Sequence, residues 1–312
     1  MSKISITYNR KLRQSLSFMQ SLNSMAVNPS APCCNSLEVG PLSARKIITI
    51  TKTTNDVDNK TTTFANIVQP MIVELIGTIF FILIGLLGAC SDDSKNNSLI
   101  AGLSFGFSLI IFVASLGHIS GGHFNPAVTL GVCIAGDIKL KKALLYMPMQ
   151  LIGGAMAAGI FRLISRTSTY HRFRGGATFL VTIETLKETG ELTKERINWW
   201  EGKWHSVVRI CIEILLTFVF VTVILMVTIN SKSKSTFAPI YIGMALCVCI
   251  FASNMLTGGS LNPARSLGSA IFANVWSHHY LYWIGPLIGA TLAGVFYRFI
   301  WGTKDNHLSD NK

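Results

Sequence analysis

The chain has 312 residues, of which half are hydrophobic and only 13% are charged. A soluble domain carries about 25% charged residues, so this composition excludes an ordinary soluble protein and indicates a polytopic membrane protein. The formal net charge of +12 is spread over tails and loops, which indicates membrane topology rather than nucleic-acid binding. The seven cysteines follow neither a metal nor a disulfide spacing, so we expect no metal and no cofactor.

The first 68 residues are rich in Ser, Thr and Asn and lack a long apolar run, which predicts a disordered N-terminal tail in the cytosol. The early basic residues and the late first acid, Glu38, are also typical of a mitochondrial transit peptide. A plain basic tail, or extra sequence ahead of a start at Met25, are the alternatives. We expect a membrane domain over residues 69–301 and a short cytosolic tail over residues 302–312.

Six apolar segments of the membrane domain are long enough to cross a bilayer, which takes about 20 residues. We expect them at residues 69–90, 99–117, 143–164, 206–229, 237–255 and 279–301. Six spans place both termini on one side, and the short loops on that side are rich in lysine. The positive-inside rule therefore predicts cytosolic termini and an external position for the long connection, residues 165–205.

One pattern occurs twice: residues 120–131 read SGGHFNPAVTLG and residues 257–268 read TGGSLNPARSLG. Asn followed by Pro suits the N-cap and first position of a helix, and the two glycines upstream allow a sharp turn. Each copy is therefore predicted to be a loop that enters a helix of about two turns. The second copy contains Arg265, and a lone cation in such apolar sequence is expected to face a watery path.

The two halves of the membrane domain, residues 69–164 and 206–301, repeat each other. Glu74 and Glu213 lie at nearly the same distance ahead of their NPA boxes, and a Thr follows each Glu four residues later. Three spans per half is an odd number, so the second half must be inverted relative to the first. Inverted repeats with broken helices are a transport architecture whose site lies at the midplane. There the positive ends of the two short helices would meet and oppose cations.

The paired NPA boxes, the H-I-S-G-G-H sequence ahead of the first, N-P-A-R-S in the second and the paired E-x-x-x-T spans resemble the aquaporin (major intrinsic protein) family. The resemblance implies an all-α polytopic membrane protein with six transmembrane helices and two re-entrant half-helices. It further implies a homotetramer and a pore lined by the NPA residues. Those residues are Asn125, Pro126, Ala127, Asn262, Pro263 and Ala264.

Glu74 and Glu213 would ordinarily suggest a proton relay, since acids inside a membrane are costly. Their pairing with the two motifs favours structural support instead, in which each carboxylate accepts backbone N–H groups of a re-entrant loop. The family carries acids in the same places for that purpose. Gln150, in the third span, resembles a family Gln that contributes to this scaffold.

The narrowest point of the family's pore corresponds here to Phe105, Ile250, Gly259 and Arg265. Phe and Arg match the water-selective members, which typically carry His where this chain has Ile250. An apolar wall suits carbon-bearing solutes such as glycerol or urea. Against this, Ser266 stands where glycerol channels usually carry Asp, as in the water branch.

The predicted function is passive conduction of water, with glycerol, urea or other small uncharged solutes admitted by the altered filter. One alternative is a channel primarily for glycerol or urea. An alternative of another class is an ion- or proton-coupled secondary transporter, for which only His118 and His123 remain as titratable candidates. No constellation indicates an enzyme. We expect the cell membrane as the location, with an intracellular membrane as the alternative.

Overall fold

The computed structural model describes residues 64–91, 97–178 and 205–302, and every regular element in these ranges is a helix. The predicted disordered tail up to residue 63, residues 179–204 of the long connection and the C-terminal tail from residue 303 lie outside the described residues. Residues 64–68 form a π-helical turn, η1 (Phe64–Val68), that leads into the first long helix. This turn lies within the last residues of the segment predicted as the N-terminal tail.

Six long helices make up most of the described chain. They are α3 (Gln69–Ala89), α4 (Asn97–Ser120), α6 (Leu140–Ile164), α10 (His205–Thr228), α11 (Ala238–Thr257) and α13 (Leu281–Phe296). The π-helical turn η3 (Tyr297–Trp301) extends the last one. The shorter elements are α5 (Pro126–Ala135), α7 (Thr167–Arg172), the 3₁₀ turn η2 (Arg174–Gly176) and α12 (Pro263–Ala273).

The predicted spans coincide with the long helices to within three residues at each end when η3 is counted as part of the last one. Five helices in the described ranges are long and apolar enough to cross a membrane, whereas the Ala238–Asn254 stretch of α11 counts as a shorter apolar helix. The whole of α11 has 20 residues, about 30 Å at 1.5 Å per residue, which equals the thickness of the hydrocarbon core. The helices of the NPA boxes have 10 and 11 residues, so the predicted length of two turns is too short.

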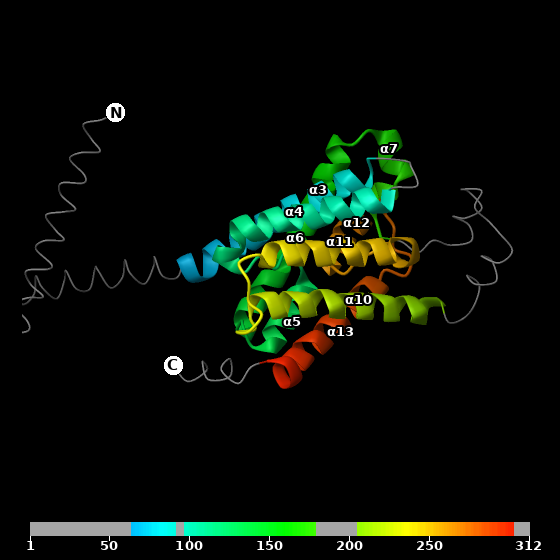
Figure 1. Cartoon of the computed structure of the whole chain (residues 1–312). Helices are drawn as coiled ribbons and strands as arrows, with labels where there is room; N and C mark the ends of the chain where they lie inside the picture. The colour runs from blue at the N-terminus through cyan, green and yellow to red at the C-terminus, as the bar shows by residue number, and fades with distance from the viewer. Residues whose placement is uncertain (1–63, 92–96, 179–204, 303–312) are drawn as a thin grey trace, which may run out of the picture. The chain divides into compact units, whose positions relative to one another are not determined.

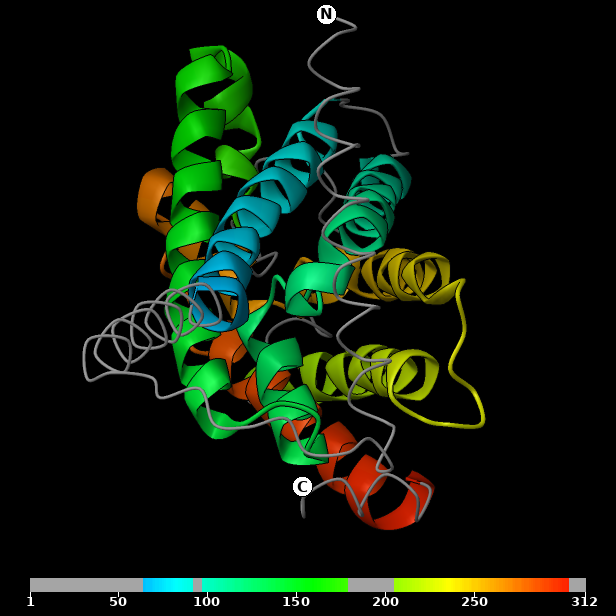
Figure 2. The same ribbon diagram turned by 90° about the vertical axis from the view of Figure 1, so that its left-hand side faces the viewer.

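The long helices pack on one another in the order α6, α3, α4, α11, α10 and α13 (Figures 1 and 2). The two short helices complete this arrangement, because α12 packs on α6 and α5 packs on α13. Each half therefore lends its short helix to the last long helix of the other half. The two NPA boxes meet in the interior as a result.

Glycines at the end of both motif copies permit this exchange. A Cβ at Gly268 of α12 would overlap the backbone carbonyl oxygen of Gly154 in α6. A Cβ at Gly131 of α5 would lie 3.1 Å from the carbonyl oxygen of Ala290 in α13 and 2.6 Å from Cγ1 of Val221. Helix backbones that approach so closely leave no room for a side chain, a common feature of helix packing in membranes.

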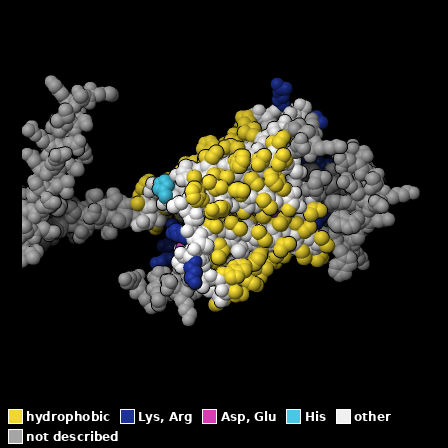
Figure 3. All heavy atoms as spheres, in the orientation of Figure 1, with side chains coloured by type: hydrophobic (Ala, Val, Ile, Leu, Met, Phe, Trp, Pro, Cys, Tyr) yellow, Lys and Arg dark blue, Asp and Glu magenta, His cyan; other side chains and the backbone are white. Residues whose placement is uncertain are grey.

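The outer faces of the long helices are apolar. Along α3 the exposed side chains recur every three or four residues and are Ile72, Ile76, Phe80, Ile84 and Leu87. Figure 3 shows a broad hydrophobic surface, with Lys and Arg gathered toward its ends. An apolar surface of this extent is unfavourable in water but matches the hydrocarbon of a bilayer. The fold is that of a multi-pass helical membrane protein.

Candidate functional site

Each short helix begins at the Asn of its own NPA box. Oδ1 of Asn125 accepts a hydrogen bond from the backbone N–H of Ala127 at 2.8 Å, and Oδ1 of Asn262 accepts one from Ala264 at 2.9 Å. The proline at the first helical position has no N–H to satisfy, so capping by Asn and initiation by Pro act together. Both box sequences thus form the helix N-termini that their pattern predicts.

The amide nitrogens of the two asparagines link the two motif copies. Nδ2 of Asn125 donates to the carbonyl oxygen of Leu261 at 2.9 Å, and Nδ2 of Asn262 donates to the carbonyl oxygen of Phe124 at 3.0 Å. Phe124 and Leu261 have φ values of 49° and 50°. This left-handed conformation costs a residue other than glycine roughly 1–2 kcal/mol. The reciprocal bonds use one hydrogen of each amide and leave a second for another acceptor.

The carboxylate of Glu74 is fully buried and holds the first re-entrant loop. Its Oε1 accepts hydrogen bonds from Oγ of Ser120 at 2.6 Å and from the backbone N–H of His123 at 3.0 Å. Its Oε2 accepts from the N–H of Phe124 at 2.7 Å and from Nε2 of Gln150 at 2.8 Å. These bonds satisfy loop N–H groups that have no helical partner, a need that is acute away from water.

Glu213 makes the corresponding hydrogen bonds to the re-entrant loop of the second half. Its Oε1 accepts from Oγ1 of Thr257 at 2.6 Å and from the N–H of Ser260 at 3.1 Å. Its Oε2 accepts from the N–H of Leu261 at 3.0 Å. Neither Glu74 nor Glu213 is among the residues that line the cavities described below. The geometry is the one that structural support requires.

Two tyrosines brace the same loops, and the sequence analysis did not assign them this position. The hydroxyl of Tyr146 in α6 donates to the carbonyl oxygen of Ser120 at 2.9 Å, and that of Tyr282 in α13 donates to the carbonyl oxygen of Thr257 at 2.8 Å. Both rings are completely buried. A sequence signal for this position was available, because each Tyr stands seven residues before a glycine in its half. In the structure, that glycine faces the Thr of E-x-x-x-T.

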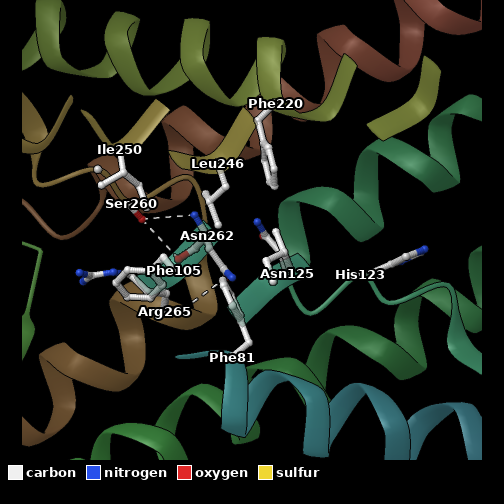
Figure 4. Close-up of a pocket in the computed structure, with 12 residues that line it drawn as sticks. Phe81, Phe105, His123, Asn125, Phe220, Leu246, Ile250, Ser260, Asn262 and Arg265 are labelled. Carbon is white, nitrogen blue, oxygen red and sulfur yellow. Dashed lines mark hydrogen bonds between the residues drawn. The ribbon is translucent and has the colours of Figure 1, made fainter. Parts of the chain in front are cut away.

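A cavity lies where the two motif copies meet. Predicted pore and filter residues on its wall are Phe105, Asn125, Ile250, Gly259, Asn262 and Arg265. Figure 4 shows the two asparagines in the middle, with Phe105, Ile250 and Arg265 toward one end and His123 toward the other. The remaining predicted NPA residues do not line it and instead form the buried first turns of the two short helices: Pro126, Ala127, Pro263 and Ala264.

The end of the cavity that carries Arg265 is partly apolar. The guanidinium carbon of Arg265 lies 5.2 Å from the centroid of the Phe105 ring, a distance at which a cation is attracted to the ring face. A Cβ at Gly259 would lie 3.5 Å from Cα of Ile250, so these two residues share a wall. The four predicted filter residues therefore lie together, with one charged donor among apolar groups.

The described start of the long connection reaches this same end, which the sequence analysis missed. Nη1 of Arg265 donates to the carbonyl oxygen of Gly176 at 2.9 Å. Two residues later, Oγ1 of Thr178 donates to Oγ of Ser266 at 2.8 Å. Gly175 and Gly176 have φ values of 60° and 66°, which an L side chain rarely adopts. The paired glycines were the available signal for a tight turn at this point.

His123 connects this cavity to a second one, because it lines both. The second cavity is bounded by the glycines of the first motif, by Asp137 and by apolar residues of α10 and α11. Nδ1 of His123 lies 3.1 Å from Oγ1 of Thr129. His118, the other histidine considered from sequence, lines neither cavity. The two cavities follow one another along the interior of the helix bundle.

Consecutive cavities through a bundle, with two half-helices that meet in the first of them, define a membrane channel of the inverted-repeat class. Residues 60–297 match the family model described as "Major intrinsic protein". The chain is 34% identical to Aquaporin-8 of Mus musculus over 241 residues, which covers 77% of this chain and 85% of that protein. It is 32% identical to Probable aquaporin-3 of Gibberella zeae over 241 residues, covering 73% and 76%. The chain belongs to the major intrinsic protein family, the aquaporins.

A solved structure supports the fold. The chain resembles the X-ray structure of the aquaglyceroporin from Plasmodium falciparum with a TM-score of 0.59 and 20% sequence identity. The match covers 75% of this chain and 96% of the other. The predicted fold class, with transmembrane helices and two half-helices in an inverted repeat, is confirmed.

Proposed function

We propose that this chain is a passive channel for water that also conducts small uncharged solutes such as glycerol or urea. The observation that carries this proposal is the cavity in which Asn125 and Asn262 lie side by side in the middle and Arg265 lies at one end against apolar residues. Relatives are named aquaporins, and the structural neighbour is named an aquaglyceroporin. Passive conduction changes no covalent bond, so the proposal includes no enzyme activity.

Water is expected to pass the two asparagines in single file. Each Nδ2 donates one of its two hydrogens to the opposite loop, so the second hydrogen can be donated to a passing water oxygen. The N-termini of α5 and α12 meet at the same place, and their dipoles make it electropositive. A water held by two donors at a positive site cannot relay protons along the file, and cations are repelled.

The filter residues favour a broader range of solutes than water alone. Arg265 supplies the hydrogen-bond donor and the positive charge, while Phe105 and Ile250 supply apolar wall and Gly259 supplies no side chain. At a polar constriction a solute must form the hydrogen bonds that water would form with the wall. An apolar wall makes no such demand on the carbon atoms of the solute. Ile250 in place of a His therefore accounts for admission of glycerol and urea.

Coupled transport is the weaker alternative. Titratable residues on the walls of the two cavities are His123, Asp137 and Arg265. A proton or ion relay needs successive titratable groups along the path. The two membrane carboxylates, Glu74 and Glu213, accept hydrogen bonds from the loops instead.

Proteoliposomes test the proposal, with water, glycerol, urea and ion permeabilities measured on the same preparation. Wild type should carry water and glycerol above empty vesicles, with no current under voltage clamp. Ile250→His should keep much of the water flux and lose most of the glycerol and urea flux, whereas Ile250→Val, which keeps the apolar wall, should retain both. Absence of glycerol flux in wild type would reduce the protein to a water pore, and a protein-dependent ion current would contradict proton and cation exclusion.

Three further properties belong to this proposal: cytosolic termini, the cell membrane as location and a homotetramer. The orientation is supported by lysines that cluster in the short loops on the side of the termini: Lys139, Lys141, Lys142, Lys232 and Lys234. Labelling of single cysteines introduced at Lys232 or in the tail, with and without permeabilised cells, would test it. Cross-linking in the membrane should give species up to four chains, and a monomer at every cross-linker concentration would contradict the tetramer.

A further inference from the structure

A third cavity lies away from the conduction path, between the start of α3 and the start of α6. Its lining includes Lys139, Lys141 and Lys142. The apolar part of its wall includes Ile67, Met71 and Leu145. Among the residues that the structure describes, none that lines this cavity is acidic. A cavity that combines three cations with apolar walls fits a ligand that is anionic at one end and apolar at the other.

The surroundings indicate where such a ligand comes from. The cavity lies at the ends of two membrane-spanning helices, which is the level of the lipid headgroups. Leu140 and Leu144, on the first turns of α6, are 65% and 59% exposed, so an apolar surface continues from the cavity along the helix. The N-cap of α6, Lys139, makes no side-chain capping bond, so the positive helix end adds to the lysine charges.

We propose that this cavity binds an anionic phospholipid. The phosphate and any further headgroup acid lie among Lys139, Lys141 and Lys142, and an acyl chain follows the exposed leucines of α6. Amphipathic lysine stems suit this position, because they cover apolar surface and present the ammonium group at the interface. Lys142 already has its Nζ 5.3 Å from the centroid of the Tyr146 ring.

Tyr146 places this lipid next to the channel scaffold. Its ring lines the cavity, and its hydroxyl donates to the carbonyl oxygen of Ser120, whose own hydroxyl donates to Glu74. A ligand that binds this cavity in the folded protein, and not in the unfolded chain, stabilises the folded state by mass action. Thermal stability should therefore rise when the lipid binds, in addition to the binding signal itself.

Native mass spectrometry of the full chain in detergent can count retained lipids. The probes are dioleoylphosphatidylserine, dioleoylphosphatidylcholine and dioleoylglycerol, which keep the acyl chains and vary the headgroup. Wild type should retain one phosphatidylserine in preference to the other two. Because each lysine near a membrane surface contributes about fivefold to binding of anionic lipid, Lys139→Gln/Lys141→Gln/Lys142→Gln should weaken that retention on the order of a hundredfold.

The matched control is Lys232→Gln/Lys234→Gln, which removes exposed lysines from another short loop and should leave retention unchanged. The single variant Lys141→Glu repeats the test if the triple variant does not fold, since its side chain is exposed. Equal retention by wild type and the Lys141→Glu variant overturns the proposal. If the triple variant and the Lys232→Gln/Lys234→Gln variant lose lipid retention equally, the lipid is held by unspecific surface charge, which also overturns the proposal. Displacement of the lipid by millimolar inorganic phosphate assigns a free-anion site instead.

Discussion

The first and second halves of the membrane domain place the same hydrogen bonds around their short helices but recruit different residues to complete them. In the first half Gln150, one turn after Tyr146, donates to Glu74 and, at 2.7 Å, to Oγ1 of Thr129. In the second half the residue one turn after Tyr282 is Pro286, which has no such donor. Glu213 accordingly has one hydrogen-bond donor fewer than Glu74.

The missing contact in the second half is replaced from outside the helix bundle. Thr129 and Ser266 occupy equivalent positions, four residues after their NPA asparagines. Thr129 is held by Gln150 of α6, whereas Ser266 is held by Thr178 of the connection that also holds Arg265 through Gly176. In the second half, the connection that contacts Arg265 through Gly176 therefore also makes the hydrogen bond that α6 makes in the first half. The hydrogen bonds that hold the loops are therefore common to both halves, and the two halves differ next to Arg265.

Removal of the buried carboxylates should have the largest effect. Glu74→Ala leaves four donors unpaired and Glu213→Ala leaves three, at about 1–3 kcal/mol for each buried donor. Glu74→Ala should therefore destabilise more, with little folded protein in either case. The Gln variants keep one acceptor oxygen and should be milder. Thermal unfolding in detergent measures all four variants, and equal losses for Ala and Gln would mean that the charge itself is required.

The motif glycines should rank next. Gly268→Ala drives a methyl group into the backbone carbonyl of Gly154, while Gly131→Ala meets mainly Cγ1 of Val221 and a carbonyl at 3.1 Å. Backbone yields less readily than a side chain. Gly268→Ala should cost about 3 kcal/mol, the upper part of the range for overpacking, and Gly131→Ala about 1 kcal/mol. Gly117→Ala is a control for the folded yield, because a Cβ there would make only an ordinary contact, at 3.6 Å from Cγ1 of Val113. An order in which Gly131→Ala is the worse variant would contradict the packing argument.

Much of this arrangement could be predicted from sequence, because the motif is local. Asn followed by Pro, after two glycines and ahead of an apolar run, favours a capped helix start through local geometry alone, and Glu74 and Glu213 stand out as acids inside apolar spans. The roles of Gly176 and Thr178 could not be predicted, since they lie in a polar connection with no counterpart in the first half. Their contacts to Arg265 and Ser266 join residues far apart in the chain. Tertiary contacts of this kind leave no periodic pattern.

Substitution of Gln150 and of Pro286, which stand at equivalent places in the two halves, should have smaller effects on stability. Gln150→Ala removes donors to Glu74 and Thr129, and we expect a loss of about 1–2 kcal/mol in the free energy of unfolding because two hydrogen bonds contribute about that amount. Pro286→Ala, at the equivalent place in α13, removes no hydrogen bond, since proline has no N–H to donate, and should change the free energy of unfolding by less. Chemical denaturation of the two variants side by side measures this difference. Equal effects would mean that Gln150 contributes packing alone.

Thr178→Val should have the smallest effect on stability and a distinct effect on selectivity. The change keeps the side-chain volume and removes the hydrogen bond to Ser266, which should cost about 1 kcal/mol. Because the same turn presents the Gly176 carbonyl to Arg265, a displaced turn loosens the guanidinium at the end of the cavity. The ratio of glycerol to water permeability should then rise about twofold, at roughly 0.4 kcal/mol per twofold change. Thr167→Val, an exposed threonine earlier in the connection, should alter neither quantity. If Thr178→Val lowers stability but leaves the permeability ratio at the wild-type value, the connection anchors α12 without orienting Arg265.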